Sequence, residues 1–205
     1  GSALYAKIEN DKAPDALALS TPTATTYGAS PGLTEQDLAG TWTVSDGSQA
    51  GYRVAEVLNG QDVTVVGRTS DVEGTVTIDG TSLSAADVTV SMTTITTDNS
   101  NRDGQFLDIL KTSEFPTATF TLTEPVDVSG VTEGTTSVQA KGELTVAGVS
   151  APVVVALDAQ TTATGVEVSG SIPVTFSDFG VDAPDLGFVK VEDTGTVEML
   201  LTLAK

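Results

Sequence analysis

The fold of this chain is decided by Ser84–Phe120, which reads SAADVTVSMTTITTDNSNRDGQFLDILKTSEFPTATF. On either side of this stretch, short runs alternate polar with apolar residues, which is the period of a β-strand with one buried face. Inside it, a polar turn at Asp98–Gly104 precedes a compact apolar cluster at Phe106–Leu110. We therefore predict an all-β chain that is interrupted once, by a short helical insertion near residues 102–114.

The segments from Gly40 onward are rich in valine and threonine, β-branched residues that suit a pleated sheet. They predict strands at 41–45, 51–58, 62–69, 74–78, 86–96, 117–122, 136–146, 151–160, 165–175 and 189–203. Five turn signals are placed as hairpin connections would be: Asn59-Gly60, Asp79-Gly80, Glu133-Gly134, Ala147-Gly148 and Asp193-Thr194-Gly195. Many short antiparallel strands with tight turns indicate a sandwich or a closed barrel.

Two of the predicted segments, 87–97 and 189–203, are longer than typical strands. Long strands suit the tilted staves of an elongated barrel better than a small sandwich. A barrel of about eight strands leaves an interior that side chains fill or that one slender ligand occupies. The predicted fold is therefore an elongated antiparallel β-barrel of the lipocalin-like kind.

Composition narrows the function classes. The chain has 205 residues, with 9 Lys and Arg against 28 Asp and Glu, a formal charge of −19. This charge repels phosphate backbones and anionic membrane surfaces, so we expect no nucleic-acid partner. The absence of cysteine excludes disulfides and thiolate metal sites. The absence of histidine removes the usual general base and the commonest zinc ligand. We expect no enzyme, and the catalytic alternative that remains is a carboxylate-based hydrolase that uses Asp178 or Asp185.

The first part of the chain differs from the rest. Residues 1–38 are predicted to be an arm or linker, and residues 39–205 the β domain. Gly1-Ser2 resembles the remnant of an expression tag, so we expect a natural N-terminus with a signal or anchor upstream. Residues 33–38 are predicted to form one helical turn, capped by Thr34 with Asp37 at its third position.

Several motifs, in this order, resemble the YceI-like family of lipid-binding proteins. The resemblance covers about residues 39–205 and rests on Gly40-Thr41-Trp42-Thr43-Val44, Gly51-Tyr52-Arg53-Val54, Val65-Val66-Gly67-Arg68, Glu73-Gly74-Thr75-Val76-Thr77-Ile78, Asn101-Arg102-Asp103-Gly104, Phe115-Pro116, Lys141–Val149 and Phe176-Ser177-Asp178-Phe179-Gly180-Val181. The chain departs from the family pattern where members often carry histidine, since Ser48 or Glu56 and Gln105 stand there. The arm at 5–11 is similar to that of actinobacterial members with a membrane anchor.

The resemblance implies a lipocalin-like barrel whose apolar channel holds a polyisoprenoid, either an isoprenoid quinone such as menaquinone or a prenyl phosphate. It implies binding, storage or transport without catalysis or a catalytic cofactor, in an extracytoplasmic domain tethered to the cell envelope. The expected oligomeric state is a monomer or a homodimer. The alternative is a structural or adhesive cell-surface domain with a fully packed interior and no ligand, which the Thr-rich strands fit equally well.

The candidate ligand-binding residues are mostly aromatic or aliphatic. Each aromatic residue is also compatible with ordinary core packing. Val65 and Ile95 are further candidates for the wall of the channel. The predicted set is Trp42, Tyr52, Val54, Val90, Met92, Arg102, Phe106, Leu107, Leu110, Phe115, Phe120, Phe176, Phe179 and Phe188.

Arg102 stands out because the chain has few basic residues. It could hydrogen-bond a quinone carbonyl or a pyrophosphate at the channel mouth, or pair with Asp98, Asp103 or Asp108 to hold the turn. The run Asn99-x-Asn101-x-Asp103-Gly104 superficially resembles the start of a calcium loop, but Leu110 stands where the bidentate Glu belongs. No metal site and no catalytic residue are therefore predicted.

Overall fold

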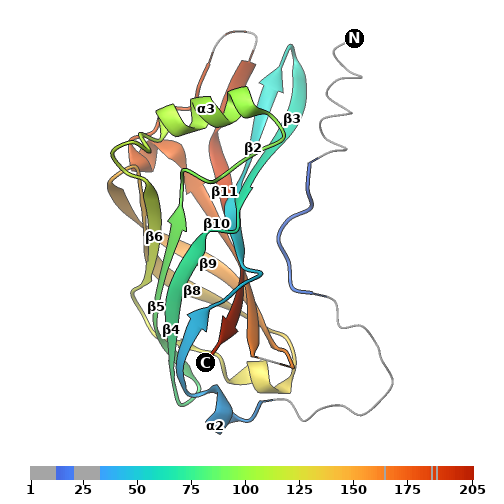
Figure 1. Cartoon of the computed structure of the whole chain (residues 1–205), viewed down its shortest axis with the longest axis vertical. Coiled ribbons are helices and arrows are strands. Elements are labelled where there is room, and N and C mark those ends of the chain that lie inside the picture. Colours follow the sequence, from blue (N-terminus) through green and yellow to red (C-terminus); the bar gives the residue numbers. More distant parts are fainter. Residues whose placement is uncertain (1–12, 21–32, 164, 186, 188) are drawn as a thin grey trace.

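The computed structural model describes residues 13–20, 33–163, 165–185, 187 and 189–205. The secondary structure is mostly strand, as Figure 1 shows. The strands are β1 (Gly40–Val44), β2 (Gln49–Leu58), β3 (Gln61–Thr69), β4 (Val72–Asp79), β5 (Ser82–Ser91), β6 (Thr117–Leu122), β7 (Val126–Asp127), β8 (Thr136–Val146), β9 (Val149–Thr161), β10 (Val166–Thr175) and β11 (Val189–Ala204). The helices are α2 (Glu35–Leu38), α3 (Ser100–Ile109) and the short 3-10 helices η1 (Ser129–Glu133) and η2 (Phe176–Phe179).

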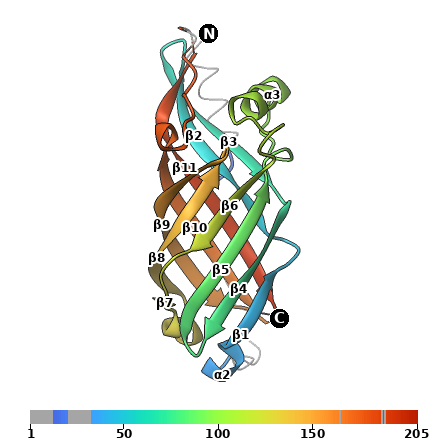
Figure 2. The same ribbon diagram turned by 90° about the vertical axis from the view of Figure 1, so that its left-hand side faces the viewer.

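Eight of the strands form a closed antiparallel barrel, which confirms the predicted fold. Their order is β1-β4-β5-β6-β8-β9-β10-β11, and the ring closes because β1 also pairs with β11. The strands are steeply tilted around a long axis (Figure 2). In the part of the chain that the structure describes, no helix is long and apolar enough to cross a bilayer.

The hairpin β2–β3 extends the barrel wall at the end where α3 lies (Figure 1). β11 pairs with β1 only near its C-terminal end and with β2 along the rest, from Leu200↔Gln49 to Val189↔Leu58. On its other side the hairpin meets the chain at a single bridge, Arg68↔Thr96. At this end β2 and β3 therefore stand beside β11, in the place that β1 takes at the other end.

Three details of the predicted strands and turns were wrong. Asp193-Thr194-Gly195 is no hairpin turn, because it lies inside β11 where the register shifts between Val191 and Gly195 as in a β-bulge. Glu133-Gly134 ends η1. The long strand predicted at 86–96 ends at Ser91: the Met92 N–H still donates to the Pro116 carbonyl, but Pro116 has no N–H to return the bond, and Thr96 then pairs with Arg68 of β3. The chain changes partners there and cannot continue one strand.

The two helices follow their capping signals. In α2, the Thr34 side chain accepts from the Asp37 N–H and the Asp37 carboxylate accepts from Thr34, the predicted capping box. In α3, the Asn99 side chain accepts from the Asn101 and Arg102 N–H groups. The residues predicted as a polar turn therefore form the first turn of α3, because a single Asn supplies the acceptor that the free N–H groups need.

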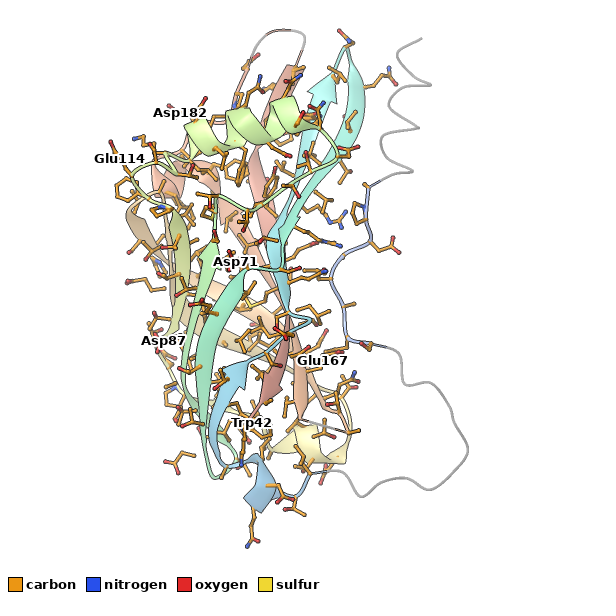
Figure 3. All side chains as sticks on the ribbon, viewed as in Figure 1. Trp42, Asp71, Asp87, Glu114, Glu167 and Asp182 are labelled. Atoms are coloured by element: carbon orange, nitrogen blue, oxygen red, sulfur yellow. The ribbon has the colours of Figure 1, made fainter. Side chains whose placement is uncertain are left out.

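The end of the barrel that carries α2 is packed solid. Its core contains Leu38, Trp42, Ile78, Val131 and Leu203, all nearly inaccessible to solvent. Figure 3 places Trp42 at this end and Asp182 at the opposite end, beside α3. Any ligand space must therefore lie toward α3.

Candidate functional site

The barrel is hollow toward α3, where it encloses a cavity of about 230 Å³. Residues from seven strands and two helices line it, and most of them are aliphatic or aromatic. The charged residues among them are Glu56, Arg102, Asp182 and Glu198. The cavity therefore suits a ligand that is apolar over most of its length.

The floor of the cavity is set by the last residue on each strand, counted from α3 toward α2, that still lines the cavity. Phe120 on β6, Leu144 on β8 and Met199 on β11 line it, whereas the buried residues Ala140 on β8 and Leu201 on β11, further toward α2, do not. Glycines give these side chains room. A Cβ at Gly142 would lie 2.3 Å from the Phe120 ring, and one at Gly170 would lie 2.8 Å from Met199 Cγ. Phe120 and Met199 thus fill the barrel cross-section and separate the hollow part from the packed part.

The structure brings together most of the predicted ligand-binding residues at this cavity. The predicted wall residues Val65 and Ile95 also face it. The residues of the predicted set that line the cavity are Tyr52, Val54, Val90, Met92, Arg102, Phe106, Leu110, Phe120, Phe176 and Phe179.

Three predicted residues lie elsewhere. Trp42 belongs to the packed end, where its Nε1–H donates to the Leu38 carbonyl at 2.8 Å. Phe115 is 36% exposed and covers Gly148, outside the cavity. Leu107 is half-buried and does not face the cavity; its carbonyl accepts from Thr112. A fourth, Phe188, lies outside the described residues.

α3 is fixed over the cavity by an aromatic stack. Phe106 on α3 and Tyr52 on β2 stack with ring centroids 4.6 Å apart and planes at 15°. The stack needs Gly67 on β3, because a Cβ there would lie 2.4 Å from Tyr52 Cε1. Burial raises the pKa of the Tyr52 phenol, so the ring stays neutral against the helix at physiological pH. This contact holds the helix as a lid over the mouth.

An ion pair fixes the same helix to the same strand. Arg102 on α3 donates to Glu56 on β2 at 2.8 Å and lies 3.6 Å from Asp98. Of the three aspartates predicted as partners of Arg102, Asp98 lies within ion-pair distance. The pairing with Glu56 was not predicted. Glu56 could have been found from strand period, since it follows Tyr52 and Val54 on the inward face of β2.

Sequence reasoning also missed an irregular part of the wall. Val181, Ala183 and Pro184 follow η2 and line the cavity beside Gln105 of α3. The alternation of polar and apolar residues does not reveal them, because they lie on a loop.

The run that resembles the start of a calcium loop has a structural role instead, since Asn99 caps α3 and Asp103 accepts from the Thr97 N–H and hydroxyl. Within the described ranges, no cluster of three or more Asp or Glu residues is arranged to hold a metal ion.

We expect the loss of Arg102 to destabilise the protein more than the loss of Glu56. Arg102→Gln leaves a carboxylate with 7% side-chain exposure unpaired, whereas Glu56→Gln leaves an arginine that is 21% exposed and still beside Asp98. The expected losses in free energy of unfolding are about 2–3 kcal/mol for Arg102→Gln and about 1 kcal/mol for Glu56→Gln. Urea unfolding measures both, and equal losses would show that the buried carboxylate is solvated.

Two glycine variants test whether Gly67 provides the space that the Tyr52–Phe106 stack needs. Gly67→Ala forces its Cβ against the Tyr52 ring and against Ile95, so we expect a loss of about 1–3 kcal/mol in unfolding free energy. Gly104→Ala lies inside α3 with no atom within 4 Å of the added Cβ, so we expect a gain of about 0.5–1 kcal/mol. Thermal unfolding of the two proteins should shift in opposite directions. A stable Gly67→Ala protein would contradict the packing of Tyr52.

Comparisons with known proteins agree with this architecture. The model of the YceI-like domain family matches residues 42–203. A polyisoprenoid binding domain from Saccharophagus degradans, described as implicated in plant cell wall breakdown, superposes with a TM-score of 0.61 at 17% identity, covering 80% of this chain and 97% of that one. BcnA from Burkholderia cenocepacia gives 0.59 at 19% identity, covering 75% and 96%.

A third solved structure, the YCEI protein of Campylobacter jejuni, gives a TM-score of 0.52 at 22% identity and covers 68% of this chain and 84% of that one. At such identities these likenesses establish the shared fold. No match to this chain is found among the curated proteins.

Proposed function

This chain belongs to the YceI-like domain family, and from that premise we propose that it binds, stores or transports an isoprenoid lipid without catalysis. The observation that carries the proposal is the apolar cavity under α3. A prenyl chain has a large apolar area and forms no hydrogen bonds. Its burial in a dry tube stabilises the complex by roughly 25 cal/mol per Å². The Saccharophagus relative, described as a polyisoprenoid binding domain, supports the same ligand class.

The mouth of the cavity favours a neutral head group over a phosphate. Arg102 is already engaged by Glu56 and Asp98, and Asp182 adds a further carboxylate to the lining. A prenyl phosphate would have to compete with these carboxylates for one guanidinium. A quinone carbonyl needs only one of the remaining guanidinium N–H donors. We therefore propose an isoprenoid quinone, such as menaquinone, as the ligand.

The net charge of −19 supports a place for the protein in the exchange of this lipid at the cell envelope. An acidic exterior keeps a carrier soluble and separated from anionic lipid surfaces between transfers. The helix α3, held by one stack and one ion pair, acts as the gate through which the prenyl tail enters. Its release requires breaking these two contacts with β2, the hydrogen bonds from Thr97 to Asp103, and the packing of Ile109 against the core.

Native mass spectrometry of protein purified from a membrane background tests the proposal. We expect one added mass that organic extraction removes and that added menaquinone restores. A prenyl diphosphate of equal tail length should restore it poorly if the head-group argument holds. Bare protein that takes up neither lipid would overturn the proposal and favour a structural or adhesive domain.

A further inference from the structure

The segment Ala13–Ser20, here called the strap, lies extended along the outer face of the barrel, beside β2 and β11 (Figure 1). It joins no strand ladder, yet barrel side chains hold its backbone at both ends. At one end, Arg53 of β2 donates to the Pro14 carbonyl at 2.5 Å and Arg68 of β3 donates to the Asp15 carbonyl. These contacts recognise the backbone of the strap.

The other end of the strap is held by groups of opposite character. The Ser20 N–H and hydroxyl donate to the two carboxylate oxygens of Glu167 on β10, at 2.5 and 2.8 Å. Gln160 on β9 donates to the Ser20 carbonyl at 3.0 Å and also to Glu167. Figure 3 shows Glu167 beside the strap. This end therefore recognises a backbone unit together with a hydroxyl side chain.

Between the two ends lies a carboxylate that the proposed lipid site does not use. Glu198 alternates with Val197 and Met199 along β11, and its carboxylate pairs with Arg53 and Arg68, two arginines that do not line the cavity. It is only 6% exposed and accepts from Arg53 at 2.8 Å and Arg68 at 3.2 Å. The register aligns Glu198, Gly51 and Arg68 across three strands, and Gly51 has no side chain to block the approach.

We propose that the outer wall carries a second binding site, the strap groove, formed by Arg53, Arg68, Gln160, Glu167 and Glu198. Its ligand class is an extended peptide with two successive carbonyls at one end and a serine or threonine at the other. Residues Ala13–Ser20 are its built-in occupant. Glu198 orients the two guanidinium groups, so that each presents its free N–H to a carbonyl of the peptide.

Occupancy of the strap groove is coupled to the lid through β2 and β3. Arg53, which binds the strap on the outside, lies between Tyr52 and Val54, which face the cavity on the inside. The backbone of Arg68 exchanges two hydrogen bonds of 3.0 Å with Thr96, in the segment that leads into α3. Release of the strap therefore loosens the strands that seat Phe106 and Arg102.

Hydrogen exchange on the full chain tests both the strap groove and its coupling to α3. Leu17→Asp with Ser20→Pro changes only the strap: it places a charge at a half-buried position and removes both donors to Glu167. Ala16→Asp, at an exposed strap position, adds the same charge as a control. In lipid-free protein we expect exchange in α3 to rise by at least about fivefold in the double variant and to stay unchanged in the control, and limited proteolysis should cut the strap faster in the double variant alone.

A peptide with the sequence of Ala13–Ser20, added to the double variant at about 1 mM, should restore slow exchange in α3, because a tethered segment acts at a comparable effective concentration. Failure of this rescue would overturn the site, and faster cleavage of the strap with unchanged exchange in α3 would overturn the coupling. The readout needs no lipid. Only the effect of the strap on lipid uptake rests on the proposed function of α3 as a gate. The strap groove can therefore be disproved while lipid binding stands, and lipid binding can be disproved while the strap groove stands.

Discussion

Phe106→Asp is expected to abolish most lipid uptake while the barrel stays folded. The change removes the stack on Tyr52, a contact worth about 0.5–1.5 kcal/mol beyond its burial, and turns a carboxylate toward an apolar cavity. Together these effects predict an affinity for menaquinone at least about tenfold weaker, which corresponds to about 1.4 kcal/mol. Quinone titration followed by tyrosine and tryptophan fluorescence measures it.

Phe115→Asp is the matched control. It makes the same substitution at the same end of the barrel, but Phe115 covers Gly148 on the outside and does not line the cavity. We expect an affinity within about twofold of the parent. Circular dichroism should show the same strand content in both variants. Equal weakening by the two substitutions would mean that the apolar rim as a whole, and not the stack, controls uptake.

Much of the barrel could be predicted because its signals are local. Alternation of valine and threonine with polar residues sets which side chains face inward, and Asn59-Gly60, Asp79-Gly80 and Ala147-Gly148 fix three hairpins. The Thr34 and Asp37 capping box likewise depends on residues only three apart. Such features need no knowledge of distant contacts.

What could not be predicted depends on contacts between distant segments. β5 ends at Ser91 because Pro116 on the neighbouring segment has no N–H to extend the ladder, and because Thr96 further along pairs with Arg68. The choice of Glu56 over the nearer aspartates as a partner for Arg102 depends on α3 lying across β2. Trp42 and Phe115 are aromatic like Phe106, but Trp42 lies at the packed end of the barrel and Phe115 on its outer face, which local sequence does not reveal.

The interior of the barrel is packed near α2 and hollow toward α3. Near α2, the large side chains of Trp42, Leu38 and Leu203 fill the barrel, and toward α3 the inward positions carry valines such as Val54, Val65 and Val90. Aromatic rings such as Phe106, Phe120 and Phe176 also line this part, and the lining side chains together leave the central space unfilled. A fully packed interior, which the structural or adhesive alternative requires, is thus at odds with the cavity, and a substitution that fills this space tests the difference.

Val90→Phe is expected to prevent lipid binding without lowering stability. Val90 is half-buried on β5 and faces the cavity, so a larger ring extends into empty space and buries additional apolar area. We expect the unfolding free energy of lipid-free protein to stay within about 1 kcal/mol of the parent or to rise. Bound menaquinone should fall from one molecule to a small fraction by extraction and mass spectrometry.

Val155→Phe makes the same substitution at a packed position, and we expect it to lower the stability of the protein. Val155 is 1% exposed in the packed core and does not line the cavity, so a larger ring forces its neighbours apart. Overpacking of this kind destabilises by about 1–3 kcal/mol. If Val90→Phe lost as much stability as Val155→Phe, the interior under α3 would be packed in solution and the carrier proposal would fail. Opposite outcomes at the two valines would place the hollow, and with it the ligand, between β5 and the lid.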